Sequence, residues 1–239
     1  MIDVDKNAKI DIGISPTKLL IKINEKLKQL STRYDKTYQH LLKDLEKENI
    51  FILNEKHLDK EHGEFVRTYF QEKVRLEIFP VMLDKVKEFP VLQDASIYLA
   101  VRFSKTKTNQ THYALIEVPT YTLSRFVVLP PKKDKQFILF LDDVIRYNLK
   151  SIFQIYDFDK IEAYTIKFTR DAELDVDNDV SLTLLESMEL GLKKRKEGNA
   201  LRFLYDAEMP KDFQHYLIKK MELDKKTELY AGSRYHNFK

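Results

Sequence analysis

The chain has 239 residues, of which 43% are hydrophobic and 12% aromatic, so it can bury a core and is not disordered throughout. Its 41 lysines and arginines against 38 acids leave a formal net charge of +3, which does not mark a nucleic-acid-binding protein. Cysteine is absent, which excludes disulfides, a thiolate nucleophile and a cysteine-based zinc site.

The amino-terminal stretch MIDVDKNAKIDIG is polar and acidic, without the basic and apolar regions of a signal peptide. No apolar run approaches the roughly 20 residues needed to span a bilayer. The sequence therefore predicts a cytoplasmic protein without a membrane span, in which residues 1–14 form a lead-in or linker.

A long helix is predicted from Ser15-Pro16, because serine can cap a helix and proline is tolerated in the first turn. Apolar residues then recur at steps of three or four, which predicts one buried stripe as far as about Glu48. The stripe consists of Leu19, Ile23, Leu27, Leu30, Tyr34, Tyr38, Leu41 and Leu45.

A second helix is predicted from about Asp59, with its end marked by Pro80 and Pro90. Two long helices joined by a short link are expected to pack antiparallel. Residues 15–90 are therefore predicted to form a long antiparallel helical hairpin.

The apolar period changes to two after Pro90. Residues 97–103 alternate as in a half-buried strand, and residues 112–118 return as the second strand of a hairpin. Two further short strands are predicted at 125–129 and 136–141.

Strands and helices alternate in the remaining chain. Asp142 is predicted to cap a helix that runs to about Phe153, and another helix opens at Pro210. The other elements predicted are strands at 161–169, 200–205 and 227–232 and a helix at 180–197. Residues 91–239 thus form a mixed β-sheet part packed with helices, and the fold class is α+β.

The acidic run TRDAELDVDND (169–179) has two interpretations. Asp175, Asp177 and Asp179 have the spacing of a calcium loop, with Glu186 at the twelfth position. However, Val180 takes the sixth position, where a calcium loop needs glycine, so the alternative is that these acids cap the helix at 180–197.

Four basic residues are candidate contacts for an anion or another protein surface. Arg170 follows the apolar stripe of a predicted strand, where it could meet an anion or a partner's carboxylate. Arg234, His236 and Lys239 cluster near the end of the sequence and would form an anion site if that segment is folded. The run Lys193–Lys196 could bind a polyanion, or could simply be the solvated last turn of a helix.

No enzyme motif is visible. The six histidines lack the HExxH spacing or any other tight metal-ligand spacing, and the five glycines form no phosphate-binding loop. By composition and spacing the sequence predicts no catalytic, cofactor-binding or metal-binding residue.

Several segments, in this order, are similar to the bacterial polyphosphate kinase family of the histidine-phosphorylated, polyphosphate-synthesising type. They are NIFILNE (49–55), YLAVRF (98–103), YALIEVPTYTLSRFVVLPP (113–131), LDDVIRYNLKSIF (141–153), AYTIKFTRDAELD (163–175), LRFLYDAEMP (201–210) and GSRYHNFK (232–239). The resemblance covers residues 8–239 and implies that residues 15–239 are the head, or middle, domain.

The resemblance implies a parent enzyme that reversibly transfers the terminal phosphate of ATP to polyphosphate through a phosphohistidine, with magnesium. In the family the catalytic histidines and magnesium-binding arginines lie beyond the position of Lys239, and a nucleotide-contacting asparagine motif lies before Met1. No catalytic residue is therefore carried over, and this chain alone is expected to be inactive.

The resemblance further implies a scaffold with dimer contacts. Its expected partners are the N-terminal and C-terminal catalytic domains of the same chain, in a homo-oligomer, with no nucleic acid. The alternative is a free-standing polyanion-binding module.

Overall fold

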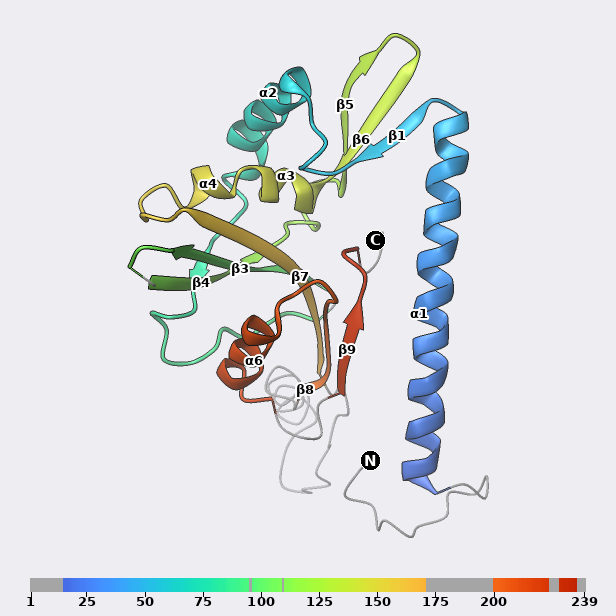
Figure 1. Ribbon diagram of the computed structural model, residues 1–239, viewed down its shortest axis with the longest axis vertical. Helices are drawn as coiled ribbons and strands as arrows, with labels where there is room; N and C mark the ends of the chain where they lie inside the picture. Colours follow the sequence, from blue (N-terminus) through green and yellow to red (C-terminus); the bar gives the residue numbers. More distant parts are fainter. Residues whose placement is uncertain (1–14, 95, 109, 171–199, 224–227, 236–239) are drawn as a thin grey trace, which may run out of the picture.

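The computed structural model describes residues 15–94, 96–108, 110–170, 200–223 and 228–235, which form an α+β fold, as the sequence predicts, with the strands divided between two sheets (Figure 1). The acidic run at 171–179, the predicted helix at 180–197 and the basic run Lys193–Lys196 lie outside these residues. Within the described ranges, no helix has both the length and the apolarity to cross a membrane.

The first helix, α1 (Pro16–Lys47), has the predicted boundaries. Ser15 is extended before the helix, and Pro16 fits its first turn because a missing N–H is not needed there. Asn49 has a φ of 60°, a left-handed conformation that asparagine tolerates, and it turns the chain out of the helix.

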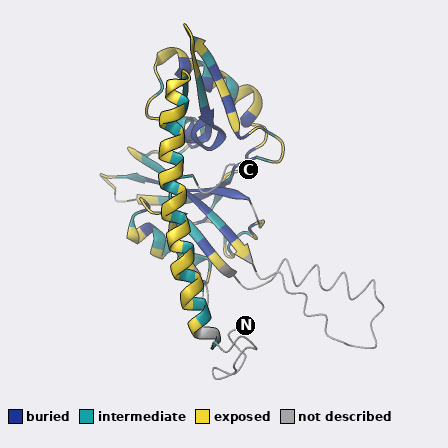
Figure 2. Ribbon diagram, turned by 90° about the vertical axis from the view of Figure 1, so that its right-hand side faces the viewer, coloured by how far each residue is buried: buried dark blue, intermediate teal, exposed yellow. Residues whose placement is uncertain are grey.

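The predicted apolar stripe of α1 is only partly covered. Figure 2 shows α1 exposed along most of its length beside the rest of the molecule. Ile23, Leu30 and Leu41 are 42%, 49% and 50% exposed. The half-buried face is rotated from the prediction and consists of Leu19, Leu20, Asn24, Leu27, Ser31, Asp35, Tyr38, Leu42 and Leu45, of which Leu19, Leu27, Tyr38 and Leu45 belong to the predicted stripe.

The predicted antiparallel pairing of two long helices is wrong. The four apolar residues of β1 (Ile50–Leu53) pair in parallel with β6 (Lys135–Phe140) and separate the helices. The next helix, α2 (Lys60–Tyr69), continues into one π-helical turn, η1 (Phe70–Val74), and is shorter than predicted. It packs on β5 (Phe126–Lys132) and on α3 (Leu141–Tyr147), away from α1 (Figure 1).

The smaller sheet has the strand order β1-β6-β5. β5 and β6 are the two short strands predicted at 125–129 and 136–141, and they pair antiparallel, with a register shift between Leu129 and Lys132 where Pro130-Pro131 interrupt the ladder. Lys133, with a φ of 54°, closes the turn between them.

The larger sheet has the order β2-β4-β3-β7-β8-β9. The predicted hairpin is β3 (Ile97–Lys105) with β4 (Gln110–Glu117), and β7 (Lys160–Arg170) pairs antiparallel with β3. β8 (Ala200–Asp206) pairs in parallel with β9 (Glu228–Gly232) across the helix α6 (Lys211–Lys220). The two-residue strand β2 (Val81–Met82) forms the other edge.

The half-buried interpretation of 97–103 is wrong, because β3 is covered on both faces. Leu99, Val101 and Phe103 enter a core under α2, η1, α3 and α4 (Leu149–Ile152). Tyr98 and Ala100, on the opposite face, enter a second core with Phe203, Phe213 and Leu217 of β8 and α6. The intervening residues of β3 are themselves mostly apolar, which is typical of a strand buried on both faces.

Candidate functional site: a buried charge network

The most unusual chemistry in the described residues surrounds α3, where two adjacent aspartates are completely buried. Asp142 and Asp143 lie in the first turn of the helix, and both are 0% exposed. The predicted capping role of Asp142 is wrong: the residue at the N-cap position is Phe140, and the Asp142 carboxylate faces arginines. We call the surrounding set the buried charge network; it consists of Glu55, Arg125, Asp142, Asp143, Arg146 and Arg234.

Arg146 connects the aspartates to the larger sheet. One turn after them on α3, its Nη1 lies 2.8 Å from Asp143 Oδ1 and 3.4 Å from Asp142 Oδ2. Its Nη2 donates to Thr165 Oγ1 at 2.5 Å, and its Nε donates to the carbonyl of Ala163 at 3.3 Å. The spacing of three and four residues on a helix brings these charges onto one face.

Asp143 also binds the last described residues of the chain. Arg234 Nη2 donates to Asp143 Oδ1 at 2.7 Å and also contacts the carboxylate of Glu55, which follows β1. The Tyr235 hydroxyl donates to Asp143 Oδ2 at 2.5 Å, and its ring packs on Phe140 with centroids 4.5 Å apart. The network therefore joins the smaller sheet, α3, the larger sheet and the segment after β9.

The arginines and carboxylates of the network face one another within the chain. Ion pairs within 4.0 Å link the three arginines Arg125, Arg146 and Arg234 to the three carboxylates Glu55, Asp142 and Asp143. Buried charges are tolerated when they are paired in this way, although Asp142 Oδ1 and Arg234 Nε have no hydrogen-bond partner among the described residues.

The two neighbouring aspartates have opposite pKa shifts. Burial raises the pKa of Asp142, and the adjacent Asp143 charge adds to this effect against the attraction of Arg146. Burial also acts to raise the pKa of Asp143, but Arg146 and Arg234 outweigh it and hold that pKa below 3.8. Burial, followed by the Asp143 charge, raises the pKa of Tyr235, so its hydroxyl keeps the proton that it donates. The shifts favour an ionised Asp143 as the centre of the network.

Of the four predicted contact residues, the structure describes the side chain of Arg234 alone. Arg170 ends β7 just after a register shift at Thr169, and its side chain lies outside the described residues. His236 and Lys239 also lie outside them. Arg234 faces Glu55 and Asp143 of its own chain, so a contact with an external anion or another domain is untested for all four residues.

The network as a whole is not visible in the sequence, because its members are far apart in the chain. Arg234 and Asp143 are separated by 91 residues, and Arg234 and Glu55 by 179. One local signal was available: LDDVIR places Arg146 three residues after Asp143 and four after Asp142, the spacing of helical ion pairs.

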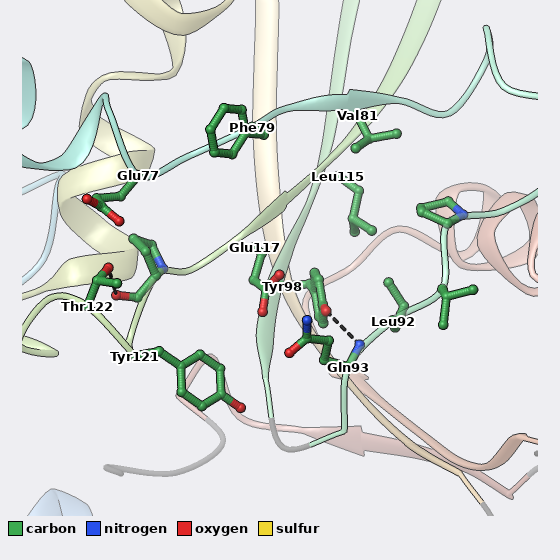
Figure 3. A pocket seen from close by; sticks show the side chains of 13 residues that line it. Glu77, Phe79, Val81, Leu92, Gln93, Tyr98, Leu115, Glu117, Tyr121 and Thr122 are labelled. Atoms are coloured by element: carbon green, nitrogen blue, oxygen red, sulfur yellow. Dashed lines mark hydrogen bonds between the residues drawn. The ribbon is translucent and has the colours of Figure 1, made fainter. Parts of the chain in front are cut away.

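Two concave surfaces lie away from the network. One, of about 1390 Å³, separates α1 from β8 and β9 and is spanned by a hydrogen bond from the Tyr230 hydroxyl to Asn24. The other, of about 420 Å³, lies beside β2 and β4 (Figure 3). Within the described residues no group of three histidine, aspartate or glutamate side chains is arranged to hold a metal ion.

The fold and the site together define a class: a mixed α+β domain with a buried network of ion pairs at the junction of its two sheets. The family model described as "Polyphosphate kinase middle domain" matches residues 61–239. The chain therefore belongs to the polyphosphate kinase family, and its residues 61–239 correspond to the middle domain.

Individual relatives agree with this assignment. The chain is 38% identical to a polyphosphate kinase of Vibrio vulnificus and 33% identical to that of Escherichia coli K12, each over 225 residues, 92% of this chain and 32% of the relative. The crystal structure of polyphosphate kinase from Porphyromonas gingivalis superposes with a TM-score of 0.71 and 27% identity, over 92% of this chain and 31% of the other. The chain thus spans about a third of the length of the relatives it matches.

Proposed function

We propose that this chain is the non-catalytic head domain of a polyphosphate kinase, serving as a scaffold and supplying dimer contacts. The parent enzyme would reversibly transfer the terminal phosphate of ATP to polyphosphate through a phosphohistidine. Such a step needs a positioned histidine nucleophile and cations that offset the charge of the transferred group.

One observation carries the scaffold role. Arginine is a residue type that binds phosphate, and each of the three gathered arginines lies within 4.0 Å of a carboxylate of the same chain. Their charge therefore stabilises the junction of the two sheets and leaves little attraction for a polyanion. This also makes the free-standing polyanion-binding module the weaker alternative.

Magnesium and ATP would accompany the parent reaction. Among the described residues no three histidine, aspartate or glutamate side chains are grouped to hold a metal ion, and magnesium commonly binds through one or two carboxylates together with substrate phosphates and water. No step through the metal is therefore assigned to this chain, and both ligands are proposed for the rest of the parent.

The catalytic proposal is tested by incubating this 239-residue chain with ATP and magnesium and measuring polyphosphate, with the full-length parent as the positive control. We expect synthesis by the parent and none by the isolated chain. Sustained synthesis by the isolated chain would refute the assignment of a non-catalytic domain.

The dimer proposal is supported by the uncovered side of α1, where Ile23, Leu30 and Leu41 are about half exposed. Apolar side chains aligned on one helix face often mark an interface. Leu30→Glu with Leu41→Glu in the parent should shift the sedimentation coefficient from dimer to monomer. Ile155→Glu, at a position 84% exposed and distant in the fold, is the control and should leave it unchanged.

A further inference from the structure

The smaller of the two concave surfaces has the character of a docking site. We call it the β2–β4 groove; its outer edge is formed by Phe79, Val91 and Tyr121, which are 79%, 67% and 69% exposed. Its floor is apolar, formed by Leu92, Leu115 and the ring of Tyr98, each no more than 4% exposed. Large apolar side chains left in solvent around an apolar hollow are typical of an interaction surface.

Local hydrogen bonds hold the groove open in this shape. The Gln93 backbone N–H donates to the Tyr98 hydroxyl at 2.8 Å and fixes the 90–93 segment over the sheet (Figure 3). Ser96 Oγ donates to Glu117 Oε1 at 2.7 Å and orients that carboxylate. A preformed groove of this kind loses little conformational entropy when a ligand binds.

The groove is negatively charged. Its two ionisable acids are Glu77 and Glu117, and no lysine, arginine or histidine is among its lining residues in the described chain. Neither carboxylate has an ion pair with a described residue. In Figure 3 Glu117 lies beside Tyr98, between the segment that carries Phe79 and the segment that carries Gln93. A cation entering here would meet carboxylates and the faces of aromatic rings, both of which attract it.

We propose that the β2–β4 groove receives a segment from the remaining two-thirds of the polyphosphate kinase chain, bearing an apolar side chain next to a lysine or arginine. The apolar side chain would cover the floor, and the cation would be attracted by the negative charges of Glu117, beside Tyr98, and of Glu77, at the side of the groove (Figure 3). The inference rests on the proposed function, because it requires the further domains of the parent. The chain spans 32% of its relatives, and a segment of the same polypeptide is present at high effective concentration.

The test uses the full-length parent with a photo-cross-linking benzoylphenylalanine in place of Phe79. Matched controls carry the same group in place of Leu76 and Ile155, which are 76% and 84% exposed and do not line the groove. We expect an intrachain cross-link from position 79 to a segment outside residues 1–239 that carries a lysine or arginine beside an apolar residue. The controls should not reach that segment.

A second measurement asks whether the cross-linking yield depends on the negative charges of Glu77 and Glu117. Glu77→Gln with Glu117→Gln should lower the cross-linking yield about tenfold, because both charged contacts are lost while the shape is kept. If the double variant is less stable, Glu77→Gln alone serves, since Glu77 is exposed. The proposal is overturned if position 79 cross-links only within residues 1–239, to a second copy of the chain or to another protein. It is also overturned if the cross-linking yield does not depend on the carboxylates of Glu77 and Glu117. Such a result leaves the non-catalytic assignment standing, because that depends on polyphosphate synthesis by the isolated chain.

Discussion

Removing the Asp143 carboxylate tests the buried charge network most directly. Asp143→Ala deletes the acceptor of three hydrogen bonds, from Arg146 at 2.8 Å, Arg234 at 2.7 Å and Tyr235 at 2.5 Å. Hydrogen bonds to charged groups contribute about 1.5–3 kcal/mol each, so three independent bonds would total about 4.5–9 kcal/mol.

The true loss should be smaller, because Arg146 keeps Asp142 and Thr165 while Arg234 keeps Glu55. Breaking a buried pair by removing one partner typically costs about 3–5 kcal/mol, which is the expected loss in the free energy of unfolding. For a chain of this size it corresponds to a fall in Tm of about 6–20 °C.

The assay is urea unfolding followed by circular dichroism, with the slope of the transition compared to confirm that only stability has changed. Asp157→Ala is the matched control, since Asp157 pairs with Lys105 at 2.6 Å but its side chain is 81% exposed. Its midpoint should stay within experimental error, because exposed ion pairs contribute little. A loss below about 1 kcal/mol for Asp143→Ala would refute the argument that the buried network stabilises the fold.

Three further outcomes are expected from unfolding measurements. Phe103→Ala should cost about 3–5 kcal/mol, because Phe103 is fully buried, whereas Phe79→Ala, at an exposed position, should change stability by under about 0.5 kcal/mol. Gly63→Ala should lower the free energy of unfolding by about 1 kcal/mol despite the better helix propensity of alanine, because the new Cβ meets the Tyr147 hydroxyl. Adding Tyr147→Phe to this variant should restore part of the lost stability. The pKa of Asp143 is lower in the folded protein than in the unfolded chain, so its ionised carboxylate contributes to the free energy of unfolding above about pH 4, and this contribution is lost as the pH falls. The difference in the free energy of unfolding between wild type and Asp143→Asn should therefore be larger at pH 7 than at pH 3. The first expectation is contradicted if Phe103→Ala and Phe79→Ala lower the free energy of unfolding equally. The second fails if Tyr147→Phe restores no stability, and the third fails if the difference between wild type and Asp143→Asn does not change with pH.

Elements with a clear local pattern could be predicted from the sequence. The boundaries of α1 follow from Ser15-Pro16 and from the end of its apolar repeat, and the β3–β4 hairpin follows from alternation around a polar turn. β1 was missed because four apolar residues between two helices do not reveal that they pair with β6, more than 80 positions later. Burial of β3 on both faces likewise depends on α6, which lies far along the chain.

The buried charge network likewise could be predicted only in part from the sequence. The helical spacing of Asp143 and Arg146 is visible in the sequence, but its extension to Glu55 and Arg234 exists only once the chain is folded. The α1 stripe shows a different limit. Periodicity finds the apolar side of a helix but not what covers it, and here the rest of the described chain covers a neighbouring face.

The attachment of Arg234 and Tyr235 to Asp143 has a mechanical consequence. A pull applied beyond Tyr235 is not borne by β9, the edge strand that a peeling force would otherwise detach first. The load passes instead into α3, between the two sheets, so that ionic contacts must rupture before the strand can unzip. The movement of a domain attached beyond Tyr235 would therefore be transmitted to α3 through the contacts of Arg234 and Tyr235 with Asp143.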